Sequence, residues 1–119
     1  MEHSEEFLKL TDDAKSRIKE VSVEDAIERM ASGAALIDVR EDSEWDEGHA
    51  AGAVHMGRGV IERDVVGRFP DKSTEIILYC GGGFRSALSA DSLQRMGYTN
   101  VYSMSGGWKA WKDAGGAVE

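Results

Sequence analysis

Short apolar runs alternate with amphipathic, helix-like segments along most of this 119-residue chain. Runs such as 34–39 and 76–79 are bounded by glycines or charged residues, which is typical of buried strands. Short links join these runs to the helical segments, and such alternation favours parallel strands connected by crossover helices. We therefore predict an α/β fold in which helices cover both faces of a parallel sheet.

Local signals indicate where several elements begin and end. Ser22 is followed three residues later by an acidic residue, as in an imperfect capping box, so a helix should begin after Ser22 and stop at Gly33. A polar segment, 41–47, could form a helical turn. We expect strands at 21, 34–39, 53–56, 75–79 and 101–104, and further helices at 4–18, 59–69, 86–96 and 108–114.

Length and composition fit one packed domain, since 41% of the residues are apolar. We assign residues 1–19 to an N-terminal helical arm and residues 20–119 to a single domain. The net charge of -8, without any Lys/Arg-rich run, argues against nucleic acid or a membrane as partner. The acidic N-terminus does not fit a signal peptide, and one cysteine cannot form an internal disulfide. These features predict a soluble, cytoplasmic protein.

The chain's one cysteine, Cys80, directly follows the apolar run 76–79. It should therefore lie at the carboxyl end of a strand, where α/β folds bind ligands, and at the positive end of the next helix. Backbone amides of a glycine-rich loop can turn toward the sulfur and stabilise a thiolate, while an arginine attracts anions. The candidate loop residues are Gly81, Gly82, Gly83, Phe84 (a shield at the rim), Arg85 and Ser86 (a helix cap or a hydrogen-bond donor to the sulfur). This combination predicts a nucleophilic cysteine rather than an inert buried one.

The length of this loop separates two thiolate chemistries. Four residues lie between Cys80 and Arg85, whereas cysteine-dependent phosphatases have five. The shorter loop suits a single sulfur atom attached to the nucleophile better than a tetrahedral phosphate. Tyr79 also precedes the cysteine, at a position where many of those phosphatases have histidine. A phosphatase or an arsenate reductase is therefore the less favoured alternative.

Four segments together resemble the rhodanese-like sulfurtransferases: 80–85, the strand end 36–40, the glycine–histidine segment 44–53 and the closing segment 106–111. The resemblance implies a five-stranded parallel sheet between two helical layers in a stand-alone rhodanese-like domain. It also implies a thiosulfate sulfurtransferase that takes sulfane sulfur from a small anionic donor as a Cys80 persulfide. A thiol, cyanide or a protein would then accept the sulfur, and no cofactor is expected. A persulfide carrier that serves one protein partner is an alternative.

Five further residues have expected roles that are less direct. In the family, arginines from the segment that holds Arg58 and Arg63 can face the site and bind anions. Asp38 and Arg40 are expected to brace the site through an ion pair or hydrogen bonds, and His49 to be a buried structural residue. No metal is expected, because the spacing of the histidines suggests no ligand set and no cysteine pair supports one.

Overall fold

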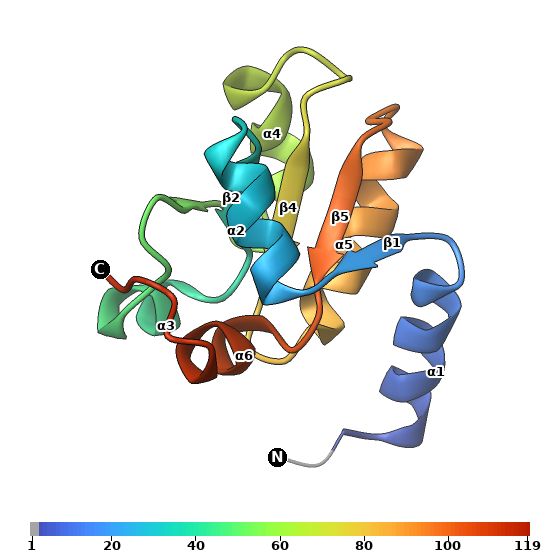
Figure 1. Ribbon diagram of the computed structural model, residues 1–119. Coiled ribbons are helices and arrows are strands. Elements are labelled where there is room, and N and C mark those ends of the chain that lie inside the picture. The colour runs from blue at the N-terminus through green and yellow to red at the C-terminus, as the bar shows by residue number, and fades with distance from the viewer. Residues whose placement is uncertain (1–2) are drawn as a thin grey trace.

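The computed structural model describes residues 3–119, so the first two residues of the predicted N-terminal arm lie outside the described residues. Helices and strands alternate along this part of the chain (Figure 1). In chain order they are α1 (Glu5–Lys15), β1 (Lys19–Val21), α2 (Val23–Ala31), β2 (Ala35–Asp38), α3 (Asp42–Glu47), β3 (Val54–His55), α4 (Ile61–Arg68), β4 (Ile76–Tyr79), α5 (Phe84–Arg95), β5 (Val101–Met104) and α6 (Gly107–Asp113).

The strands form one five-stranded sheet in the order β1-β5-β4-β2-β3, and every pair is parallel. In the register of this sheet, β4 lies between β2 and β5, with Asp38 opposite Tyr79 and Leu78 opposite Ser103. Helices α2 and α6 cover one face, while α4 and α5 cover the other (Figure 1). The predicted three-layer α/β/α architecture is confirmed, and it brings the carboxyl ends of β2, β4 and β5 to one edge.

The central strand β4 explains why its sequence is continuously apolar. Ile76 and Leu78 point into the core beneath α4 and α5, whereas Ile77 and Tyr79 point into the core beneath α2 and α6. All four side chains are fully buried. A strand with helices on both faces has no solvent-facing side, so no polar alternation appears in it.

The N-terminal helix α1, which forms most of the predicted helical arm, packs against α5. Thr11 and Ala14 are its buried residues. At its end, the Arg17 guanidinium donates to both oxygens of Asp91 on α5, at 3.0 and 2.8 Å. The Gln94 side chain also donates to the Arg17 carbonyl at 2.9 Å. These contacts fix α1 beside the helix that follows the cysteine loop.

The start of α2 agrees with expectation, whereas the segment 41–47 differs from it. The Ser22 side chain caps α2 by accepting a hydrogen bond from the Asp25 amide at 3.1 Å. The reciprocal capping box lies instead at α3, between Glu41 and Glu44, so the segment expected as a helical turn is a short helix. Within residues 3–119, no helix has the length and apolar character needed to cross a membrane.

Candidate active site

The cysteine loop connects β4 to α5, and its backbone curls over the sulfur atom. Gly83 adopts a left-handed conformation with a φ of 98°, which glycine reaches without a steric penalty. This conformation directs the Gly83 amide to donate to the Cys80 Sγ at 3.1 Å. Cys80 is 1% exposed, so the hydrogen bond lies in a site with little water to compete for it. Together with the start of α5, the amide places a positive dipole at the sulfur.

A buried pair of hydroxyl groups lies beneath the sulfur. Ser86 Oγ is 3.6 Å from Cys80 Sγ and 2.8 Å from Ser103 Oγ on β5. The alternative that Ser86 caps the helix is wrong, because α5 begins at Phe84 and its N-cap is Gly83. Ser86 is therefore the third residue of the helix, within its first turn, where its hydroxyl faces the sulfur and Ser103.

The start of α6 supports the loop from its other side. The Trp108 amide donates to the Cys80 carbonyl at 2.7 Å. Gly107, with a φ of 54°, lies so close to the loop that a Cβ there would overlap the Cys80 carbonyl oxygen and approach the Gly81 carbonyl carbon to 2.8 Å. The glycine pair before Trp108 thus lets two backbone segments meet at the nucleophile.

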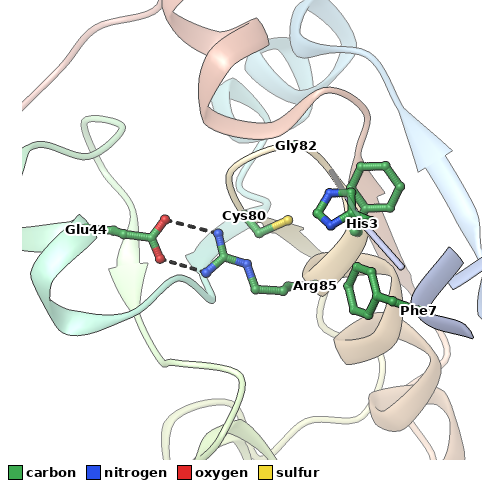
Figure 2. Close-up of a pocket in the computed structure, with 7 residues that line it drawn as sticks. His3, Phe7, Glu44, Cys80, Gly82 and Arg85 are labelled. Carbon is green, nitrogen blue, oxygen red and sulfur yellow. Dashed lines mark hydrogen bonds and ion pairs between the residues drawn. The ribbon is translucent and has the colours of Figure 1, made fainter. Parts of the chain in front are cut away.

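Arg85 forms a two-pronged ion pair with Glu44 of α3, as Figure 2 shows beside the sulfur. Its Nη1 and Nη2 atoms donate to the two carboxylate oxygens at 2.7 and 3.1 Å. The Glu41 amide donates to the same carboxylate at 3.0 Å. The hydrogen bonds from Arg85, followed by the one from Glu41, lower the pKa of Glu44 from 4.5 to about 2 despite partial burial. Glu44 is therefore a carboxylate throughout the neutral range and offsets the charge of Arg85.

This ion pair predicts an acid-dependent loss of stability. Because the pKa of Glu44 is lower in the folded protein, the stabilisation is complete above pH 4.5 and is lost as the pH falls toward 2. Both side chains are about one-third exposed, so solvent screening limits the contribution to the order of 1 kcal/mol. Chemical unfolding of the wild type and of Glu44→Gln should differ by this amount above pH 4.5 and converge near pH 2. An equal difference at both pH values would contradict the assignment.

Cys80 lines a cavity of about 450 Å³. Figure 2 shows the Arg85–Glu44 pair on one side of the Cys80 sulfur and His3 and Phe7 on the other. The cavity is lined by Cys80 and Gly82, by the ion pair, and by the rings of His3, Phe7 and Phe84. The predicted loop residues Cys80, Gly82, Phe84 and Arg85 thus come together in one concave site of the kind that binds small molecules.

Of the residues predicted to support the site, Asp38 and Arg40 form a buried pair outside the cavity lining, whereas His49 is less buried than expected. Asp38 and Arg40 are paired by hydrogen bonds of 2.8 to 3.1 Å, with side chains 0% and 4% exposed. Arg40 also donates to the Gly48 carbonyl at 2.7 Å, which joins the end of β2 to the end of α3. His49 is half-buried and stacks on Trp45, with ring centres 3.4 Å apart.

The structure places the two candidate anion-binding arginines elsewhere. Arg58 is exposed and lines a second, smaller cavity of about 160 Å³ with Arg17 and with residues of α1 and α5, including Asp13 and Asp91. Arg63 is exposed on α4 and pairs with its neighbour Asp64. Neither arginine lines the Cys80 cavity. Among residues 3–119 there is also no cluster of three or more side chains suited to hold a metal ion.

The sequence was compared with those of known protein families, and a family model described as the rhodanese-like domain matches residues 22–114. The chain belongs to the rhodanese-like domain family. A curated relative, the thiosulfate sulfurtransferase GlpE of Pseudomonas entomophila, is 32% identical over 97 residues, which cover 82% of this chain and 87% of that protein. The family predicted from the sequence is confirmed, and it is a family of sulfurtransferases.

Two solved structures show how far the likeness to the rhodanese-like domain extends. A thiosulfate sulfurtransferase from Pseudomonas aeruginosa superposes with a TM-score of 0.78 and 27% identity over 85% of this chain, which is 20% of that larger chain. A protein of unknown function from Rhodopseudomonas palustris, described as a possible tyrosine phosphatase, has a TM-score of 0.84 and 30% identity. That match covers 100% of this chain and 98% of the other, so it includes α1.

Proposed function

We propose that this rhodanese-like domain is a sulfurtransferase whose Cys80 carries sulfane sulfur as a persulfide. The observation that carries the proposal is the environment of the Cys80 sulfur. This sulfur accepts a hydrogen bond from the Gly83 amide at 3.1 Å and faces a cavity large enough for a small donor. The amide and the start of α5 would stabilise negative charge on the thiolate and on the terminal sulfur of the persulfide.

The reaction would proceed in two sulfur-transfer steps. The Cys80 thiolate attacks the outer sulfur of thiosulfate, the sulfur–sulfur bond of the donor breaks, and sulfite leaves with the electron pair. A thiolate, cyanide or a protein acceptor then attacks the terminal sulfur of the persulfide and regenerates the Cys80 thiolate. Because the chain has no second cysteine to resolve the persulfide, the acceptor must be external. We propose the thiol-rich cytoplasm as the compartment that supplies it.

Intact-mass measurement tests this proposal directly. Incubation with thiosulfate should add the mass of one sulfur atom to the protein, and a thiol or cyanide should remove it. Rapid turnover with small acceptors indicates an enzyme, whereas a stable persulfide with negligible turnover indicates a carrier that serves a protein. If thiosulfate and organic thiosulfonates all leave the mass unchanged, the proposed function is wrong.

A cysteine-dependent phosphatase is the second candidate, because the Rhodopseudomonas palustris protein is described as a possible tyrosine phosphatase. The geometry of this site argues against it. Phosphate dianions need several donors and positive charge, but the Arg85 guanidinium donates to Glu44 through both of its terminal nitrogens. The same protein preparation should therefore fail to hydrolyse p-nitrophenyl phosphate, and hydrolysis that Cys80→Ser removes would favour the phosphatase.

A further inference from the structure

The N-terminal helix contributes one wall of the active-site cavity, although it precedes the segment that matches the rhodanese-like family model. His3 and Phe7 lie against Phe84, with ring centres 4.5 and 6.2 Å from it, and the two are 5.1 Å from each other. The three rings form an aromatic cluster, which we call the aromatic wall. It combines the loop's own Phe84 with side chains from a segment far away in the sequence.

Several contacts hold this wall in place. The Ser4 side chain caps α1 by accepting a hydrogen bond from the Phe7 amide at 3.1 Å, which fixes the first turn. The Lys15 ammonium lies 4.8 Å from the centre of the Phe84 ring, within cation–π range. The ion pair between Arg17 and Asp91 ties the end of α1 to α5. The wall is therefore a built part of the cavity rather than a loose tail over it.

The opposite side of the cavity determines which anions would fit. Glu44 offsets the charge of Arg85 through its two-pronged ion pair, so this side attracts a small dianion such as thiosulfate less strongly than an unpaired guanidinium would. A monoanion meets less repulsion from the Glu44 carboxylate, and an attached apolar group can bury itself against the aromatic wall. The cavity of about 450 Å³ has room for such a group beside the sulfur.

We propose that the aromatic wall makes this site selective for monoanionic sulfane-sulfur compounds that carry an aromatic group, for which an aryl thiosulfonate is the model. The inference rests on the proposed sulfur transfer. In this reaction the Cys80 thiolate attacks the terminal sulfur of the thiosulfonate. The sulfur–sulfur bond breaks, the arenesulfinate leaves with its electron pair, and the Cys80 persulfide remains.

The test compares benzenethiosulfonate with methanethiosulfonate, two monoanions that differ in their organic group. The measured quantity is kcat/KM for benzenethiosulfonate divided by kcat/KM for methanethiosulfonate, with cyanide as the sulfur acceptor. Comparing this ratio between variants cancels the intrinsic reactivity of the two donors. Removing an aromatic contact in Phe7→Ala should lower the ratio by about threefold or more, and His3→Ala should lower it in the same direction.

Leu8→Ala is the matched control, because Leu8 lies on the same helix, is 37% exposed and is not part of the cavity lining. His3 precedes α1, so its variant keeps the test valid even if Phe7→Ala loosens the helix. A lower ratio in either cavity variant, with Leu8→Ala unchanged, supports the inference. A wild-type ratio in both, or an equal fall in Leu8→Ala, overturns it. Sulfur uptake with unaltered selectivity refutes this inference alone, whereas no uptake from any donor refutes the proposed function.

Discussion

Replacing Cys80 with serine should abolish sulfur transfer while leaving the fold intact. A serine hydroxyl is a weak nucleophile at neutral pH, and among residues 3–119 no histidine lies within hydrogen-bond distance of this position to activate it. We expect kcat/KM for thiosulfate to fall by at least about 1,000-fold, as is common when a nucleophile is removed. The measurement is steady-state transfer to cyanide, together with the intact mass after incubation with the donor.

The same substitution separates a reactive cysteine from a structural one. Serine is close in size to cysteine. Its hydroxyl can accept the hydrogen bond from the Gly83 amide and contact Ser86, as the sulfur does. The thermal unfolding midpoint of C80S should therefore stay close to that of the wild type. Loss of folding would show that Cys80 is chiefly a core residue, and sulfur uptake at the wild-type rate would remove it from the reaction.

The sequence predicted the central part of this site because the decisive signals there are local. The run 76–79 had to be a strand buried on both faces, and the glycines after it had to form the turn into a helix. β5 spans Val101–Met104, as predicted, while α5 begins two residues earlier than expected. That shift arises because Gly83, with its left-handed backbone, begins the helix without a side-chain cap.

The walls of the cavity could not be predicted in the same way, because they depend on long-range packing. Glu44 lies 41 residues before Arg85, and nothing in its own neighbourhood shows that its carboxylate would meet that guanidinium. His3 and Phe7 reach the site only because α1 turns back onto α5. The amphipathic pattern of α1 indicates a packed face but does not specify the surface that receives it.

The two candidate arginines were predicted to face the site but lie outside the Cys80 cavity, again because of long-range packing. Their charge suggested anion binding, but the side-chain direction depends on how the chain turns between β3 and α4. Arg58 faces α1 and α5, and Arg63 pairs with Asp64 beside it. A role in donor binding for either residue stays a prediction, and it would require an approach path other than the Cys80 cavity.

Removing the carboxylate of Asp38 should cause a large loss of folding stability. Arg40 is 4% exposed at its side chain, so Asp38→Ala would leave a buried guanidinium without its counter-charge. Breaking a buried pair in this way typically costs about 3–5 kcal/mol. That is a large share of the stability of a domain of this size, so the denaturant midpoint should fall steeply.

Two controls identify the buried charge as the cause of this loss. Asp113→Ala breaks the exposed pair with Lys109 and should leave the unfolding free energy nearly unchanged. Replacing both partners with apolar residues, in Asp38→Leu with Arg40→Met, should recover part of the loss because no unpaired charge remains in the core. Under conditions where Asp38→Ala stays folded, it should still take up sulfur, since neither partner lines the cavity. Loss of sulfur uptake at unchanged stability would instead place this ion pair in the catalytic machinery.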